Sequence, residues 1–266
     1  MQNRIAVAML CVWVLAVVAC KKQNVEPQPD ATQQGSLVLK FDNLVGTQLL
    51  QMNQTYQNPV TSESFKVTAL RYFISNIKLQ KADGSEYVVP QDDSYFLINE
   101  EIASSKRLSL QVPEGDYTGI TFMIGVDSLR NTMPPDRRKG ALDISGQAQG
   151  MYWTWNSGYI FFFLEGESNQ VVGDDAFRYH IGFFGGFSTP TLNNIRTTTL
   201  SFERDIALVR KNKTPEVHIM MDLLKVFNGR NFTLKISENS EIMFSALSAK
   251  VADNIKEAFF YDHIHN

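Results

Sequence analysis

The sequence predicts a mainly β protein, an antiparallel β-sandwich with Greek-key-like connections and one C-terminal α-helix. Three observations support this fold class. Aromatic residues that favour strands are abundant, with 18 Phe and 9 Tyr. Short segments of alternating apolar residues recur between turn-forming residues. Apolar side chains at helical spacing are clear only near the C-terminus.

The first residues of the chain have the layout of a secretory signal. Arg4 supplies a positive n-region, and an uncharged apolar run, short for a membrane span, extends from Ile5 to Ala19. The run closes on residues 17–20, VVAC. A small residue directly before a cysteine resembles a bacterial lipobox, in which the cysteine is acylated and becomes the mature N-terminus. An ordinary signal peptide with an incidental cysteine is the alternative.

These features divide the chain into a signal peptide at residues 1–19, a lipidated Cys20 with a flexible polar tether to residue 35, and one domain over residues 36–266. We therefore expect a lipoprotein bound to a membrane of the cell envelope. Lys21 and Lys22 replace the acidic residue associated with inner-membrane retention in some bacteria. The expected location is thus the outer membrane, facing the periplasm.

Cysteine content and charge exclude other classes of protein. Cys11 leaves with the signal, so Cys20 is the only cysteine of the mature chain and the domain must rely on its core rather than on disulfides. The formal net charge is −3 and no basic face is apparent, so no nucleic-acid partner is expected.

Apolar alternation places the strands in order along the domain. The first strand covers residues 36–41, with Leu37, Leu39 and Phe41 on one face. Residues 117–126 are expected to return from the strand at 108–112 as a hairpin, because residues 113–116 (PEGD) form a turn. The other strands are expected at residues 65–79, 160–164, 177–183, 197–202, 206–209 and 216–222.

Loops and helices complete the fold prediction. Residues 131–150, which contain Pro134 and Pro135, are expected to form a long surface loop. A helical turn at residues 223–227 should stop at the following Asn-Gly pair. The C-terminal helix is predicted by Leu247, Val251, Ile255 and Phe259 at four-residue steps.

Common enzyme signatures are missing from the chain. It contains no G-x-S-x-G elbow, no phosphate loop and no H-E-x-x-H zinc helix. The sequence therefore predicts a binding protein and not an enzyme. A hydrolase with a carboxylate-based site is a weaker alternative, for which the sequence indicates no residues.

Two predicted strands carry candidate metal ligands. Alternation places His218 and Met220 on one face of residues 216–222, and His180 opposite the apolar face of residues 177–183. An imidazole and a thioether presented together suit copper. If the fold brings His180 and His218 within roughly 4–5 Å, a metal is favoured. Unrelated histidines, hydrogen-bonded or solvated, are the alternative.

A second candidate pair lies at the C-terminus. His263 and His265 are two residues apart, so an extended chain places both imidazoles on one side, where they can chelate a metal. Because terminal residues often fray, an ordinary polar tail is the alternative.

Trp153 and Trp155 are the only tryptophans after the signal. On a strand they would share a face about 7 Å apart. Most such tryptophans pack in a core, and a redox or ligand-stacking role is the alternative.

Four segments together resemble the MbnP-like family, named for a periplasmic copper-binding protein associated with methanobactin operons. They are residues 67–79 (VTALRYFISNIKL), 120–126 (ITFMIGV), 152–159 (YWTWNSGY) and 179–182 (YHIG). The resemblance extends from about Ser36 to the C-terminus, and the W-T-W-x-x-G-Y pattern is its most specific part.

The resemblance implies a secreted β-sandwich that binds copper partly through histidines, with His180 and, by strand position, His218 as candidate ligands. It also implies a di-haem, peroxidase-type partner that oxidises a tryptophan to kynurenine, with Trp153 or Trp155 as its target. Family members often have His after the Phe of the first strand, where this chain has Asp42. A carboxylate is a harder ligand than imidazole and suits Cu(I) poorly. A metal-free module that binds a glycan, peptide or protein through exposed aromatics is the competing hypothesis.

Overall fold

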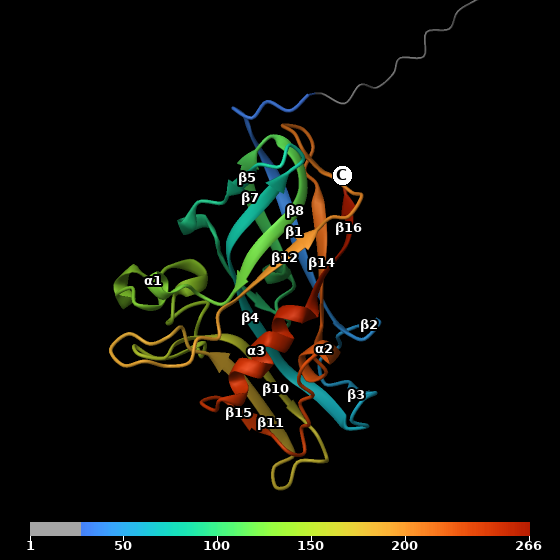
Figure 1. The fold of residues 1–266 in the computed structure, drawn as a ribbon, viewed down its shortest axis with the longest axis vertical. Coiled ribbons are helices and arrows are strands. Elements are labelled where there is room, and N and C mark those ends of the chain that lie inside the picture. The colour runs from blue at the N-terminus through green and yellow to red at the C-terminus, as the bar shows by residue number, and fades with distance from the viewer. Residues whose placement is uncertain (1–27) are drawn as a thin grey trace, which may run out of the picture.

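A computed structural model describes residues 28–266 and shows two β-sheets packed face to face, as predicted. The molecule is elongated, with the N-terminal end of β1 at one end of its long axis (Figure 1). The predicted signal peptide, Cys20 and the first part of the tether lie outside the described residues. Among the described residues, no helix is both long enough and apolar enough to cross a membrane.

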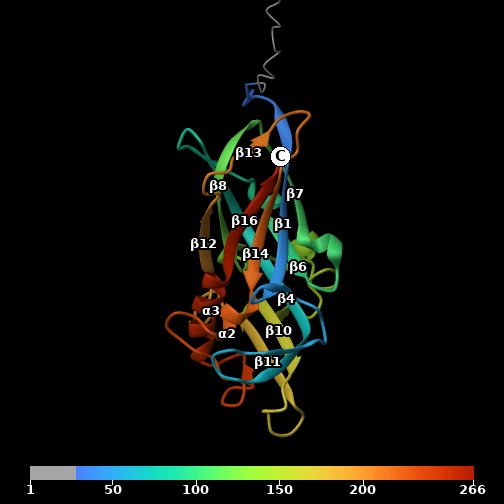
Figure 2. The same ribbon diagram turned by 90° about the vertical axis from the view of Figure 1, so that its right-hand side faces the viewer.

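The smaller sheet is built around the first strand, β1 (Gln34–Val45). β1 pairs with β14 (Glu216–Asp222) on one side and with β7 (Arg107–Pro113) on the other. β16 (Phe259–His265) pairs with β14 and forms one edge of this sheet, and the short β2 (Gln48–Leu49) pairs with the end of β1. Figure 2 shows β16, β14 and β1 side by side.

The larger sheet is organised by β4 (Ser64–Lys81), an 18-residue strand that pairs with β8 (Gly115–Ile124) and with β10 (Gly158–Glu167). β12 (Arg196–Ser201) extends the sheet beyond β8, and β11 (Ala176–Gly182) extends it beyond β10. The remaining strands are short: β3 (Thr55–Gln57), β5 (Glu86–Val88), β6 (Tyr95–Asn99), β9 (Tyr152–Thr154), β13 (Ala207–Val209) and β15 (Glu241–Ile242).

The main core fills the space between the two sheets, as strand alternation requires. β1 contributes Leu37, Leu39 and Phe41, all completely buried, while Lys40 and Asp42 face outward. At the centre four aromatic rings pack edge to face, with ring centres 5.4–6.5 Å apart: Phe41, Tyr72, Phe122 and Phe259. Phe259 is the first residue of β16, and Tyr72 and Phe122 belong to β4 and β8 of the larger sheet. This packing therefore anchors β16 to the core between the two sheets.

The sheets differ from the prediction in being mixed instead of purely antiparallel. β1 and β14 run parallel, as do β11 and β15. Two parallel strands need a long connection between them. Here the connection between β1 and β14 contains most strands of the larger sheet. The short-range turn signals that the sequence offers carry no information about such a distant pairing.

The predicted hairpin of residues 108–112 and 117–126 is wrong. β7 pairs with β1 in the smaller sheet, whereas β8 pairs with β4 in the larger one. The turn between them is a corner between sheets, and the buried carboxylate of Glu114 fixes it by accepting hydrogen bonds from the backbone N–H groups of Asp30 and Lys211.

Both predicted helices are present, although Phe259, which the spacing assigned to the C-terminal helix, is the first residue of β16. α2 (Leu223–Phe227) ends at Asn228, and α3 (Leu247–Ala258) presents Val251 and Ile255 to the main core. α1 (Ser128–Asn131) is a single turn that opens the predicted loop. The rest of that loop lacks strands, yet part of it is buried over β10, where Leu142 and Ala148 join a second, smaller core. Short 3-10 helices cover Gln91–Asp93, Ala103–Lys106, Pro135–Arg137 and Gly140–Leu142.

Candidate metal centre

Three histidines meet on the outer face of the smaller sheet. His218 comes from β14, and His263 and His265 come from the neighbouring edge strand β16. One ring nitrogen of each lies within 4.8 Å of the other two. The cluster thus joins one residue from the middle of the sheet to the predicted C-terminal pair, which is extended and ordered as part of a strand.

A β-bulge in β16 produces this convergence. Val217 pairs with Ile264 and Ile219 pairs with Tyr261, so Asp262 and His263 together stand opposite His218. The extra residue shifts the alternation of β16 by one position. Tyr261 consequently faces the core side with Ile219, while His263 and His265 both face outward beside His218.

The three rings are in direct contact. The Nε2 atoms of His263 and His265 are 3.0 Å apart, and the rings of His218 and His263 stack with centres 4.1 Å apart. Exposure increases from buried His218 through half-buried His263 to exposed His265. The cluster therefore has a buried inner side and one side open to solvent.

His218 is held in a form that can bind a metal. Burial, together with the neighbouring His263 and Lys40, lowers the pKa of His218, so its ring is neutral at pH 7. Its Nδ1 lies 3.6 Å from a carboxylate oxygen of Asp42. Its Nε2 is buried and makes no hydrogen bond. A buried ring nitrogen without a partner is costly for the fold unless a ligand satisfies it.

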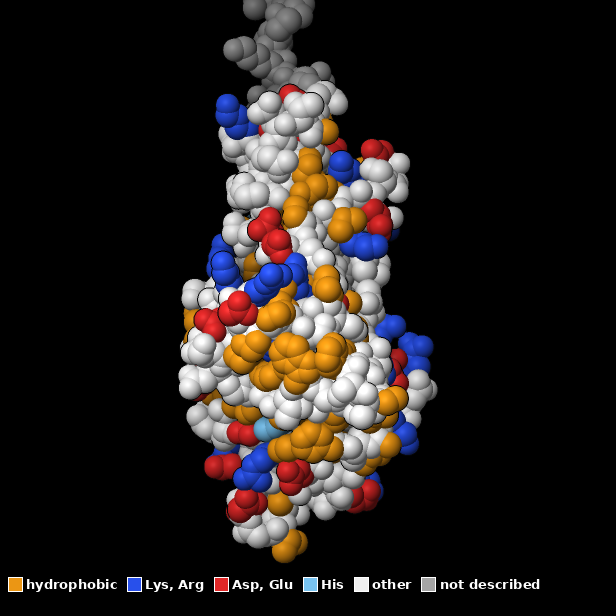
Figure 3. All heavy atoms as spheres, turned by 90° about the vertical axis from the view of Figure 1, so that its left-hand side faces the viewer, with side chains coloured by type: hydrophobic (Ala, Val, Ile, Leu, Met, Phe, Trp, Pro, Cys, Tyr) orange, Lys and Arg blue, Asp and Glu red, His pale blue; other side chains and the backbone are white. Residues whose placement is uncertain are grey.

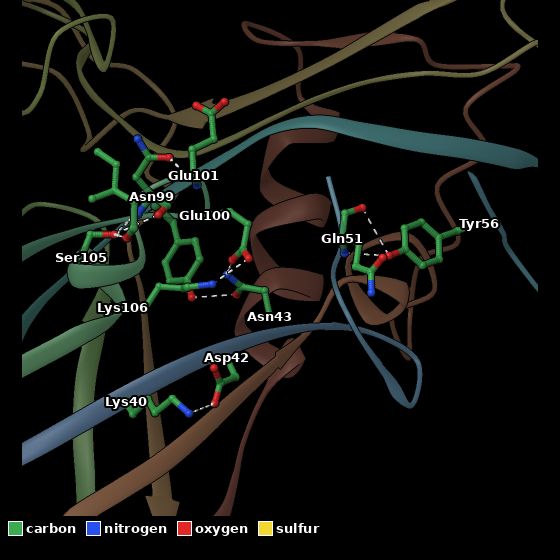
Figure 4. A network of polar contacts seen from close by, with 12 residues as sticks. Lys40, Asp42, Asn43, Gln51, Tyr56, Asn99, Glu100, Glu101, Ser105 and Lys106 are labelled. Carbon is green, nitrogen blue, oxygen red and sulfur yellow. Dashed lines mark hydrogen bonds and ion pairs between the residues drawn. The ribbon is translucent and has the colours of Figure 1, made fainter. Parts of the chain in front are cut away.

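Charged residues surround the cluster in pairs. Lys40 Nζ lies 3.1 Å from Asp42 (Figure 4), and Arg107 forms an ion pair with Glu216. Burial raises the pKa of Glu216, but the hydrogen bond and charge of Arg107 outweigh this and leave the pKa below its usual value. The carboxylate of Glu216 is therefore ionised at neutral pH and adds negative charge beside the histidines.

On the inner side of β1 a polar network supports the same region. Asn43 follows Asp42, points toward the core, and donates a 2.7 Å hydrogen bond to Glu100, which also binds Lys106 at 2.7 Å (Figure 4). The hydroxyl of buried Tyr72 donates to Asn43 at 2.9 Å. These bonds fix the backbone of β1 at the position from which Asp42 reaches His218.

The chemistry of the cluster fits a transition metal. Two nitrogens bound to one ion at about 2 Å each can be at most about 4 Å apart, so the observed spacing requires only small side-chain movements. Neutral imidazoles suit zinc, copper, iron and nickel, and at a given site copper binds most tightly among the divalent ions of this series. The donor set is thus compatible with copper.

The predicted ligand Met220 occupies the next outward position of β14, beyond His218. Its register partners are Asp42 on β1 and Phe260 on β16, and its side chain is partly buried. The structure therefore places Met220 beside the histidine cluster on the same face of the sheet, as alternation predicted.

The expected convergence of His180 with His218 does not occur. His180 lies on β11 in the larger sheet, where its Nε2 is 2.9 Å from Glu165 and its ring stacks on Phe163. Burial lowers the pKa of His180, and the hydrogen bond to Glu165 opposes this only in part. Alternation gave the correct face of each strand but not the sheet to which each strand belongs.

The two tryptophans do not share a strand face. Trp153 lies on β9 and packs on Phe183 and Phe244, with ring centres 5.2 and 4.9 Å away. Trp155 follows the end of β9, is 37% exposed, and meets the exposed Phe187 edge to face. Hydrophobic side chains gather on the face of the molecule that carries α1 and the neighbouring loops (Figure 3).

Sequence reasoning missed Glu216 as a residue of the site. Its Oε1 lies 3.0 Å from Nε2 of His218, and it stands opposite His265 in the sheet register. Alternation within the predicted strand at residues 216–222 could have found it, because Glu216 is two positions before His218 and shares its face. Arg107 could not have been found in this way, since it comes from a strand two positions away in the sheet.

A mainly β sandwich with a surface cluster of histidines defines a class of candidate metal-binding proteins. The family model MbnP matches residues 34–244, so this chain belongs to the MbnP family. The match includes His218 and ends before His263 and His265.

Among solved structures, the chain is similar to MbnP from Methylosinus trichosporium, with a TM-score of 0.54 and 17% sequence identity over 80% of this chain and 82% of that chain. At this identity the likeness establishes the fold alone. No curated protein matches the chain.

Proposed function

We propose that this protein binds copper at His218, His263 and His265, as a lipoprotein of the cell envelope. The main observation behind the proposal is the cluster of three imidazoles, of which the most buried, that of His218, has a buried Nε2 that makes no hydrogen bond. Membership of a family associated with copper supports the choice of metal. When bound, copper would supply a cation that can exist in two oxidation states.

The three histidines would contribute to the copper site in different ways. His218 provides the buried donor, and its Nδ1 lies 3.6 Å from the carboxylate of Asp42, which helps to orient the ring. His263 and His265 come from an edge strand and leave one side of the site open to water. This arrangement suits a protein that accepts and releases copper better than one that stores it permanently.

We further propose that the protein is not an enzyme and works at the outer membrane, tethered through Cys20. Replacing Cys20 with Ala should move the protein from the membrane fraction to the soluble fraction after signal cleavage, because no acyl chain could then be attached. Fractionation followed by immunodetection measures this. A Cys20→Ala protein that stays in the membrane fraction after cleavage would refute the lipid anchor.

A di-haem oxidase that converts a tryptophan to kynurenine is the partner that we propose from the family resemblance. Trp155 is the better target, because its ring is more exposed than that of Trp153 and lies beside the exposed Phe187. Such a partner could dock on the aromatic surface around these residues.

Metal analysis combined with intact mass tests both parts of this function. Protein isolated from its native envelope should contain about one copper per chain, and kynurenine formation should add about 4 Da, since the net change is a gain of one oxygen and a loss of one carbon. Recombinant protein should bind copper without the mass change. Native protein without copper, which also fails to bind added copper, would refute the proposal, and unmodified tryptophan peptides would remove the oxidase.

A metal-free binding module is the second candidate function, and a specific cavity favours it. A cavity of about 500 Å³ lies between β6 and the loop that follows α1, with Tyr95, Leu97 and Ala141 among its apolar lining and Asn99 and Arg107 among its polar lining. Its size is within the range of small-molecule sites. Binding of a glycan or peptide that is unaffected by removal of copper would favour this function.

A further inference from the structure

Glu216 presents a free carboxylate oxygen to the histidine cluster. Its Oε1 is 3.0 Å from Nε2 of His218, yet the two atoms form no hydrogen bond, although Nε2 is buried. An oxygen and a nitrogen this close without a shared hydrogen bond can both direct lone pairs at one cation. Glu216 also stands opposite His265 across the pair of strands, so it borders the cluster from two sides.

Neighbouring residues keep this oxygen in place. Arg107 pairs with Oε2, the other oxygen of the carboxylate, which leaves Oε1 directed at His218. The side chain is 17% exposed and comes from the same strand as His218. A carboxylate held at one oxygen by a guanidinium is restricted in its rotation, as a preorganised donor should be.

The nature of the donors determines which oxidation state of copper is favoured. Cu(I) is a soft ion that prefers thiolate and thioether sulfur, whereas carboxylate oxygen is a hard donor suited to ions of higher charge. The described cluster consists of three imidazoles bordered by the carboxylates of Glu216 and Asp42. The soft donor nearest in the sheet register, the thioether of Met220, lies one outward position beyond His218.

We propose that Glu216 is the fourth, anionic donor of this site and that the site therefore prefers Cu(II) to Cu(I). The inference rests on the copper-binding function proposed above. In this proposal, the negative charge of the Glu216 carboxylate is the reason why the site prefers Cu(II) to Cu(I).

Affinities of the full chain for Cu(I) and for Cu(II), each measured by competition with a chelator of known affinity, test this inference. Every sample carries Cys11→Ser and Cys20→Ser, so that no thiolate can bind Cu(I). Glu216→Gln keeps the size of the side chain and removes its charge. It should lower the Cu(II) affinity at least tenfold and change the Cu(I) affinity less than threefold. For this one-electron couple, a tenfold difference corresponds to a rise of 59 mV in reduction potential.

Two further variants serve as matched comparisons. Glu167→Gln removes an exposed carboxylate that pairs with Lys66 in the larger sheet, and it should leave both affinities unchanged. Arg107→Gln removes the guanidinium that holds Oε2 of Glu216, and it should lower the Cu(II) affinity, because Oε1 is then no longer fixed toward His218. Thermal melting followed by circular dichroism establishes that each variant is folded. If Glu216→Gln does not fold, Glu216→Asp replaces it as a variant that keeps the charge and shortens the side chain.

The outcomes separate this inference from the proposed function. If the parent chain binds copper but Glu216→Gln weakens both oxidation states equally, or neither, Glu216 is not a donor that selects Cu(II). If Met220→Leu lowers Cu(I) affinity more than Glu216→Gln lowers Cu(II) affinity, the preference for Cu(II) is overturned. If the parent chain binds neither ion, the copper-binding function itself fails.

Discussion

Replacing His218 with Ala should lower the copper affinity of this protein at least a hundredfold. His218 is the buried member of the cluster, and its Nε2 makes no hydrogen bond that would hold it away from an ion. Loss of a residue that merely supports a ligand already costs about 10–100-fold in metal affinity, so loss of a direct ligand should cost more. Competition with a chelator of known affinity measures the change.

His180→Ala is the matched control for this variant. His180 is also a buried histidine on a strand, but its ring contacts Phe163 and Glu165 in the other sheet. We expect wild-type copper affinity from this variant, provided that thermal melting shows it to be folded. Equal loss of affinity in both variants would contradict the placement of the site on the smaller sheet.

Replacing Phe259 with Ala should cost about 3–5 kcal/mol in free energy of unfolding, the usual range for a buried Phe→Ala change. Phe259 is buried and meets Phe41, Tyr72 and Phe122 at the centre of the core. It is also the first residue of β16, the strand that carries His263 and His265. The variant should therefore weaken copper binding as well, although Phe259 is not a ligand. Urea unfolding followed by tryptophan fluorescence measures the loss.

The adjacent Phe260→Ala change is the control, because this side chain points to the other face of β16. It is partly buried and lies 4.9 Å from the ammonium group of Lys225, measured from the ring centre. We expect a loss of about 1 kcal/mol or less. A similar loss from both variants would mean that β16 is not anchored to the core through Phe259.

Local patterns predicted the elements of the fold well, because each face of a strand has its own environment. The residues expected at 216–222 are those of β14, and α2 has the bounds that Asn228 implied. What the patterns could not supply was the pairing of distant strands. The pairing of β7 with β1, and not with its neighbour β8, depends on contacts between residues far apart in sequence.

The sequence predicted the histidines of the candidate site individually, but it did not predict that these three would lie together. His218, His263 and His265 were each indicated by alternation, but nothing in the sequence shows that β14 and β16 are neighbours. The bulge at Asp262 was also invisible, because a one-residue shift leaves no signal in so short a segment. The family resemblance favoured His180, whose position in the larger sheet separates it from the cluster.

The measurement that tests the central claim most directly is X-ray absorption at the copper edge of the copper-loaded full chain. Imidazole rings give a distinctive multiple-scattering pattern, so the number of bound histidines can be determined. The structure predicts three imidazoles with ligand distances of about 2 Å, and loss of part of this signal in a His263→Ala, His265→Ala double variant. A spectrum with fewer than two imidazoles, or one unchanged by the double variant, would contradict a copper centre at His218, His263 and His265.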